Sequence, residues 1–199
     1  MRTPTILPLL LLSAAAVATA DVKYVNYTID DQNGDQLSGR LVEYSPPGYW
    51  SQGNGCDHCA FHPNNQSAFN DTWHDGFRVP SRDFEPLAFQ FKFNGTAFYI
   101  FNILVRLTLT DVNITLDGTL VGSYTRFANV SEQEQFLYNV PIFAHDYIPY
   151  GEHTVGVSAF GPYQTNVLFD YAVYTCVCAL SFSSLPLPSS PSAIDLAGY

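Results

Sequence analysis

The segment Val112–Phe127 (VNITLDGTLVGSYTRF) decides the fold class. Two runs rich in β-branched residues, 112–116 and 120–127, flank the pair Asp117-Gly118. A two-residue Asp-Gly connection between such runs is a strong signal for a β-hairpin, because both residues tolerate the left-handed backbone that the turn needs. We therefore expect two antiparallel strands here.

The same kind of pattern extends in both directions along the chain. The sequence contains 15 Phe and 13 Tyr, and no long stretch keeps the 3.6-residue period of an amphipathic helix. Together with the hairpin, the expected strands are 22–29, 88–93, 96–108, 112–116, 120–127, 136–143, 153–160 and 166–175. About eight strands with polar turns predict an all-β protein, a jelly-roll β-sandwich.

Both ends of the chain differ from this central region. Arg2, the apolar run 6–17 and Ala18-Thr19-Ala20 have the form of a signal peptide, residues 1–20, with an uncleaved anchor as the alternative. Residues 179–199 are rich in Ser and Pro and predict a disordered tail. The β-sandwich domain is then expected over residues 21–178.

Six N-glycosylation sequons follow the leader, which together predict a secreted, extracellular glycoprotein. Their asparagines are Asn26, Asn65, Asn70, Asn94, Asn113 and Asn129. The formal net charge is −10 at pH 7. This charge argues against nucleic acid or an anionic membrane as partner, since both require a basic surface.

The four cysteines predict two disulfides in an oxidising compartment. Cys56 and Cys59 are close enough to bridge within their own loop. Cys176 and Cys178 would project in parallel from one face of a strand, a poor geometry for a mutual bond, so their pairing stays open. A redox pair or half of a zinc site is the alternative interpretation of Cys56-x-x-Cys59.

A segment from Ser45 to Pro86 lacks a periodic element and is rich in Gly, Pro, Asn and Asp. Loops of this length are uncommon and usually functional or disordered. We expect an ordered loop that holds the ligand site, because sugar binding needs aromatic faces beside planar polar groups. The candidate ligand-binding residues are Tyr49, Trp50, Trp73, His74 and Asp75. The alternative is that both tryptophans are buried packing residues.

Acidic residues near the first strand resemble a calcium loop: Asp30, Asp31, Asn33 and Asp35 surround Gly34. Calcium prefers several carboxylate and carbonyl oxygens that converge on one turn. The twelfth position, counted from Asp31, is Val42 rather than glutamate. The alternative interpretation is a tight turn that ends the strand. No other cofactor is expected.

Several motifs together resemble a family of secreted or single-pass surface proteins of mushroom-forming fungi. They include Tyr27-Thr-Ile-Asp-Asp-Gln-Asn-Gly-Asp35, Ala68-Phe-Asn-Asp-Thr-Trp-His-Asp75 and Leu168-Phe-Asp-Tyr-Ala172, and the resemblance covers about 24–175. This resemblance implies a galactose-binding-like β-sandwich, a fold used by many carbohydrate-binding modules. Many members continue into a Ser/Thr-rich stalk and a membrane helix.

These observations predict a secreted, non-catalytic glycoprotein that binds a glycan or cell-wall polysaccharide through the 45–86 loop. The alternative is a structural or adhesive surface protein without a small ligand. A secreted hydrolase ranks behind both. Glu43, Asp75 and Glu85 flank the loop as carboxylates for glycoside cleavage, but no Gly-x-Ser-x-Gly nucleophile motif is present.

Overall fold

The hairpin predicted at Asp117-Gly118 is present in the computed structural model, which describes residues 22–179. Strands β8 (Thr110–Leu116) and β9 (Thr119–Arg126) pair antiparallel, with Leu116 opposite Thr119. Both turn residues have positive φ, 51° at Asp117 and 78° at Gly118. This is the backbone of a type I′ turn, whose twist matches that of the strands it connects.

All eight predicted strands are confirmed, with small shifts at their ends. The other six are β1 (Val22–Asp30), β6 (Leu87–Gly95), β7 (Ala97–Val105), β10 (Phe136–His145), β11 (Gly151–Ala159) and β12 (Thr165–Ala179). Predicted and observed strands agree because the apolar alternation that defines them is also the pattern that buries one face of each strand.

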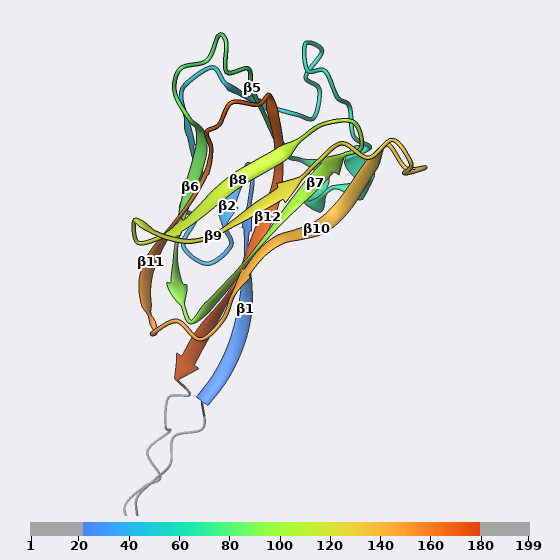
Figure 1. Ribbon diagram of the computed structural model, residues 1–199. Coiled ribbons are helices and arrows are strands. Elements are labelled where there is room, and N and C mark those ends of the chain that lie inside the picture. Colours follow the sequence, from blue (N-terminus) through green and yellow to red (C-terminus); the bar gives the residue numbers. More distant parts are fainter. Residues whose placement is uncertain (1–21, 180–199) are drawn as a thin grey trace, which may run out of the picture. The chain divides into compact units, whose positions relative to one another are not determined.

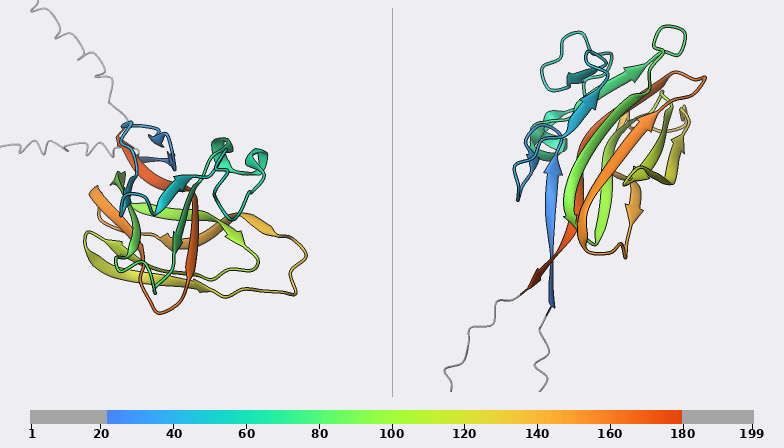
Figure 2. Two further views of the ribbon diagram at one scale, coloured as in Figure 1. Left: turned by 90° about the horizontal axis from the view of Figure 1, so that it is seen from above. Right: turned by 90° about the vertical axis from the view of Figure 1, so that its left-hand side faces the viewer.

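These eight strands form two antiparallel sheets that pack face to face (Figures 1 and 2). One sheet has the order β10-β7-β12-β1-β2, where β2 is Gly34–Asp35. The other has the order β3-β6-β11-β8-β9, where β3 is Glu43–Ser45. The long strands β1, β7, β10 and β12 belong to the first sheet and β6, β8, β9 and β11 to the second, which confirms the predicted all-β sandwich.

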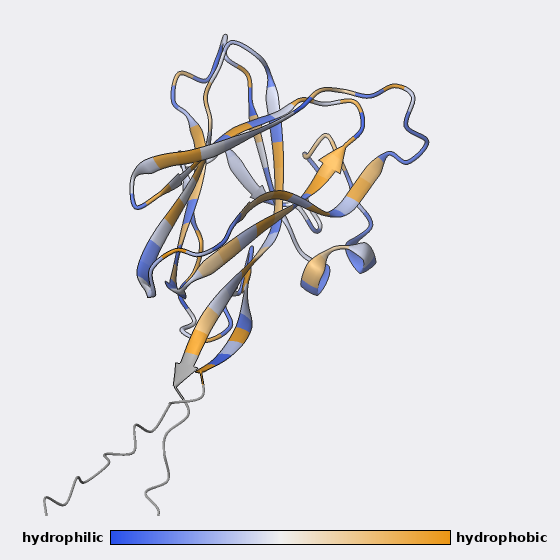
Figure 3. Cartoon of the chain, turned by 60° about the horizontal axis from the view of Figure 1, so that its bottom comes forward, coloured by the Kyte–Doolittle hydropathy of each residue, from blue (hydrophilic) through white to orange (hydrophobic). Residues whose placement is uncertain are grey.

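The core between the sheets is largely aromatic. Strand β6 alternates strictly, with Leu87, Phe89, Phe91 and Phe93 buried and the residues between them facing outward (Figure 3 shows the hydropathy along the strands). Phe89 stacks on Phe169 of the opposite sheet, with ring centroids 4.3 Å apart. Burial of each such side chain contributes about 1.5–3 kcal/mol relative to exposure.

The segment 45–86 contains more regular structure than its sequence predicts. It holds β4 (Trp50–Gln52), β5 (His74–Arg78) and two short 3₁₀ helices, η1 (Asn65–Ser67) and η2 (Phe69–Asp71). β4 pairs with β5, and β5 pairs with the first five residues of β12. The prediction of an ordered segment is confirmed, while the absence of regular elements is corrected, because strands of three to five residues are too short to show a clear period.

A second apolar cluster lies beneath this segment. Trp73 is 2% exposed and packs with Ile103, Val105 and Leu168, which lie on the outer face of the β10-β7-β12 sheet. Gly53 allows this packing, since a Cβ at that position would lie 1.9 Å from the indole nitrogen of Trp73. The cluster fastens the segment 45–86 to the sandwich.

Residues 24–178 form one compact unit. Among the described residues, no helix has the length and apolar character needed to cross a membrane. The predicted signal peptide, 1–20, and residues 180–199 of the predicted tail lie outside the described part of the chain.

We expect Gly118→Ala to lower the free energy of unfolding by about 1–2 kcal/mol, because an L-residue at positive φ is strained. A Cβ at Gly118 would meet no atom within 4 Å, so the cost comes from the backbone alone. Urea denaturation measures the change. Gly161→Ala is the matched control, as Gly161 lacks positive φ and a Cβ there would only reach ordinary contact with Oδ2 of Asp111, at 4.0 Å. Equal denaturation midpoints for the two variants would contradict the turn assignment.

Candidate functional site

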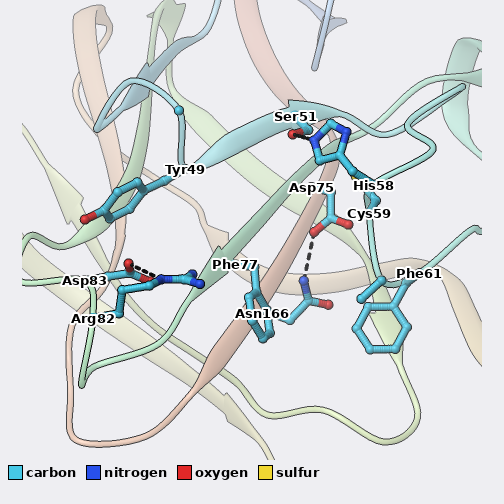
Figure 4. A pocket seen from close by; sticks show the side chains of 12 residues that line it. Tyr49, Ser51, His58, Cys59, Phe61, Asp75, Phe77, Arg82, Asp83 and Asn166 are labelled. Atoms are coloured by element: carbon cyan, nitrogen blue, oxygen red, sulfur yellow. Dashed lines mark hydrogen bonds and ion pairs between the residues drawn. The ribbon is translucent and has the colours of Figure 1, made fainter.

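The segment 45–86 forms one wall of a pocket of about 520 Å³, shown in Figure 4. Asn166 of β12 (Thr165–Ala179) also lines it. The pocket is lined by Gly48, Tyr49, Ser51, His58, Cys59, Ala60, Phe61, Asp75, Phe77, Arg82, Asp83 and Asn166. Most of its residues therefore lie in the segment that the sequence selected.

Strand alternation selects which residues face this pocket. Successive side chains of a strand point to opposite faces of the sheet. Ser51 of β4 lies opposite Asp75 of β5 in the strand register, and Phe77 follows two positions later on the same face. Asn166 of β12 lies opposite Phe77. Three paired strands thus place these four side chains beside one another.

A buried carboxyl–amide pair forms the base of the pocket. The amide nitrogen of Asn166 donates hydrogen bonds to Oδ1 of Asp75, at 2.9 Å, and to the carbonyl of Gly76, at 3.2 Å. Asp75 is 7% exposed, and burial raises the pKa of its carboxyl group to about 6, an increase that the bond from Asn166 partly offsets. Oδ1 of Asn166 is buried and has no partner among the described residues.

Two polar pairs border the base. Oγ of Ser51 lies 3.1 Å from Nε2 of His58. On the other side, Nε of Arg82 donates to Oδ1 of Asp83 at 2.9 Å, and the bond from Arg82 lowers the pKa of Asp83. Asp83 also accepts the backbone N–H of Val79. The pocket therefore presents hydrogen-bond donors and acceptors on both sides of Asp75.

Of the five predicted ligand-binding residues, Tyr49 and Asp75 line the pocket. Trp50 and His74 belong to the same strands but face the other way: Trp50 contacts Phe89 of the core, and His74 stacks on Tyr44 at 3.9 Å. Trp73 is in the second apolar cluster. The stacking role predicted for the two tryptophans is corrected, because alternation and burial turn both indoles toward packing partners.

Disulfide Cys56–Cys59 is present, with the two Cα atoms 5.4 Å apart, as predicted. Cys176 is buried in the main core, so its prediction as a disulfide partner stays a prediction. The side chain of Cys178 lies outside the described part of the structure. Cys59 also lines the pocket, so the bridge holds the loop that carries His58 and Phe61.

Among residues 22–179, the one group of three or more His, Cys, Asp or Glu side chains close enough to hold a metal ion is Cys56, His58 and Cys59. The two sulfur atoms of this group are joined to each other. A cysteine binds zinc as a thiolate, so in its disulfide form this group offers zinc a single ligand, His58, and does not form a zinc site.

The residues predicted to bind calcium form a turn stabilised by their own hydrogen bonds. Oδ1 of Asp30 accepts from the backbone and side chain of Asn33, both at 2.7 Å, and Asp35 accepts from the backbone N–H groups of Leu37 and Ser38. Asp31 pairs with Nδ1 of His74 at 2.7 Å. The carboxylates of Asp30, Asp31 and Asp35 do not gather in one place, which corrects the calcium prediction in favour of the tight turn.

The predicted glycosylation sites lie away from the pocket lining. Asn26, Asn70, Asn94, Asn113 and Asn129 are exposed, and Asn65 is half-buried. Asn65 belongs to η1 and Asn70 to η2, yet neither lines the pocket.

Of the carboxylates considered for glycoside cleavage, Asp75 alone lines the pocket. Glu43 is on β3, and Glu85 is exposed in the connection between β5 and β6. The second carboxyl group of the pocket is Asp83, which the sequence analysis did not select. Glu43 and Glu85 are therefore not part of the pocket that Asp75 lines.

Other pocket residues also escaped the sequence analysis. Asn166 is a polar residue at the start of the apolar run of β12. A polar side chain in such a run is the one sequence feature that could have indicated its place in the pocket. Arg82 and Phe61 carry no such signal, because irregular connections with no periodic pattern place them.

No family model matches the chain, and no curated protein matches its sequence. Solved structures with a similar arrangement include a Podospora anserina GH26-CBM35 β-(1,4)-mannanase, with 12% identity, a TM-score of 0.43, 79% of this chain and 28% of that chain covered. The Agl-KA catalytic domain has 12% identity and a TM-score of 0.45, and the match covers 90% of this chain and 31% of that one. The catalytic domain of a GH87 α-1,3-glucanase in complex with nigerose has 12% identity, a TM-score of 0.43, and coverage of 89% and 32%. The chain spans about a third or less of the length of these proteins.

Asp170→Asn tests a buried carboxyl group on β12. Asp170 is 0% exposed, its Oδ2 has no partner among the described residues, and burial raises its pKa to about 7. A raised carboxyl pKa means that the folded state binds the proton more tightly, so this group lowers stability progressively as pH rises from about 4 to 7. The variant removes this loss of stability. Near neutral pH we expect its free energy of unfolding to exceed that of the wild type by roughly 1–3 kcal/mol, and its melting temperature to be higher.

Thermal melts across this pH range measure the effect. The difference between variant and wild type should be small near pH 4 and level off above about pH 7. Asp117→Asn is the matched control and should lower stability at neutral pH. The hydrogen bond from His153 lowers the pKa of Asp117, so the charged carboxylate stabilises the folded state there. A pH-independent difference for Asp170→Asn would refute the buried-carboxyl argument.

Proposed function

We propose that the protein binds carbohydrate in the pocket formed by the segment 45–86. The observation that carries the proposal is the pairing of Asp75 and Asn166 at the base of a pocket that aromatic side chains surround. Sugar recognition combines flat apolar faces with planar polar groups that bond neighbouring hydroxyls. The pocket supplies both kinds of group.

The aromatic part consists of Tyr49, Phe61 and Phe77, all partly exposed. Figure 4 shows Tyr49 and Phe61 on opposite sides of the Asp75–Asn166 pair. A pyranose ring entering between them would cover apolar ring surface while its hydroxyls approach the polar base. The volume of about 520 Å³ falls within the range of about 300–1,000 Å³ that is typical of small-ligand sites.

The polar part of the pocket offers both hydrogen-bond acceptors and hydrogen-bond donors. Oδ2 of Asp75 accepts no hydrogen bond from the described residues, so it is the acceptor that the base of the pocket offers. Arg82 and His58 add donors at the entrance. Sugar hydroxyls donate and accept hydrogen bonds, so they match this mixed set better than a purely apolar ligand does.

Secretion and N-glycosylation remain part of the same proposal, supported by the leader pattern and the six sequons. A glycan or cell-wall polysaccharide is the partner that such a protein would meet outside the cell. A structural or adhesive surface role without a small ligand is the competing function, and the binding experiment separates the two.

Glycan-array and polysaccharide-retardation assays on the glycosylated protein test the proposal. We expect Asp75→Asn and Tyr49→Ala each to weaken binding roughly five- to thirtyfold, since each removes a contact worth about 1–2 kcal/mol. Phe127→Ala, which removes an exposed aromatic side chain outside the pocket lining, should bind as wild type does. Asp75→Asn keeps the size of the side chain, so a loss of binding with unchanged thermal stability cannot come from unfolding.

Two results would contradict the proposal. Failure of the wild type to bind any fungal or plant polysaccharide, with and without calcium, would favour the structural surface role. Binding that survives both pocket substitutions would place the carbohydrate site elsewhere on the molecule.

A further inference from the structure

A second hollow lies at the end of the sandwich where β1 begins and the β6–β7 turn is found, the lower end in Figure 1. Its volume is about 620 Å³. It is lined by Tyr24, Thr96, Ala97, Tyr99, Asp146, Tyr147, Ile148, Pro149 and Thr175. None of these residues lines the carbohydrate pocket, so the two sites are separate.

Three tyrosine side chains face this hollow without packing on one another. Tyr24 is 64% exposed and Tyr147 is 98% exposed, while Tyr99 is partly exposed on β7. No ring contact joins any of the three to another aromatic ring of the described residues. The rings of Tyr24 and Tyr147 are largely in solvent, and that of Tyr99 is partly so.

The backbone fixes the position of Tyr147 in an uncommon conformation. Its φ is +62°, in the left-handed region that non-glycine residues rarely adopt. The next residue, Ile148, is 6% exposed, and its N–H donates to the carbonyl of Thr96 at 3.0 Å. Backbone strain of this kind is found at ligand clamps and active sites, so Tyr147 is a candidate contact for a ligand.

Asp146 is the only charged residue among the described side chains that line the hollow. The hydroxyl of Tyr99 donates to its Oδ1, which orients the carboxylate. Its Oδ2 accepts no hydrogen bond from the described residues. No lysine or arginine lines the hollow, and the whole chain carries a formal charge of −10.

We propose that this hollow binds an organic ammonium cation, with the rings of Tyr24, Tyr99 and Tyr147 around the cation and the carboxylate of Asp146 as its counter-ion. Aromatic faces attract cations through the negative face of the ring quadrupole, by about 0.5–2 kcal/mol per contact. One uncompensated carboxylate adds a charge attraction that a neutral ligand would not experience.

Isothermal titration of the full-length protein with choline tests the site, and 3,3-dimethyl-1-butanol serves as the neutral ligand of the same shape. We expect choline to bind with a Kd on the order of millimolar and the neutral analogue to bind at least about tenfold more weakly. Equal affinity for both ligands, or no binding of choline, would overturn the proposal.

Two variants assign the binding to this hollow. Asp146→Asn removes the charge at constant size, and Tyr147→Asn removes the ring while retaining a residue that tolerates positive φ. Each should weaken choline binding roughly three- to tenfold. Tyr163→Asn, at another exposed tyrosine, is the control and should bind choline as wild type does.

Choline binding that is unchanged in both Asp146→Asn and Tyr147→Asn would place the cation elsewhere and refute the assignment. Asp75→Asn separates this proposal from the carbohydrate proposal, because it should weaken glycan binding and leave choline binding unchanged. Neutral sugar bound in this hollow in place of choline would also count against the ammonium assignment.

Discussion

Antiparallel pairing of β5 with the first residues of β12 is the constraint on which the candidate site depends. It joins the segment 45–86 to the long strand that closes the sandwich, and it sets Asp75 beside Asn166. Since side chains alternate across a strand, a shift of one residue in this register would send Asp75 toward the core and bring Gly76 into the pocket. Two features oppose such a shift: Gly76 lies under the ring of Trp50, where a Cβ would approach within 2.6 Å, and Trp73 is buried against Leu168.

The two tryptophans therefore support the pocket by packing against the sandwich, without lining the pocket themselves. Trp50 contacts the core aromatic Phe89, and Trp73 fills the second apolar cluster. Hydrophobic burial at these two residues offsets a part of the entropy lost when a segment of about forty residues becomes ordered. The polar base is placed by the same packing, and it retains acceptor atoms without partners among the described residues, such as Oδ1 of Asn166. A buried acceptor of this kind is costly until a hydroxyl or water reaches it.

The two hollows differ in the chemistry that they offer. The pocket beside β4 and β5 holds Arg82 and His58 as well as Asp75 and Asp83, so donors and acceptors are mixed around the aromatic side chains. The hollow beside the β6–β7 turn has tyrosine rings and the single charge of Asp146. A neutral ligand rich in hydroxyls fits the lining of the first pocket, where charges of both signs are present. A cation fits the lining of the second hollow, because it neutralises the single carboxylate there.

The sequence by itself determined the all-β class, the eight long strands, the Asp117-Gly118 hairpin and the Cys56–Cys59 bridge, because each depends on residues that are close in the chain. It also selected the segment that carries Tyr49 and Asp75. Only the tertiary structure decided that Trp50, Trp73 and His74 turn away from the pocket, and that Asn166 enters it from a strand far along the chain. Burial and strand register are properties of contacts between distant segments, so local composition could not reveal which face of β4 and β5 meets the core.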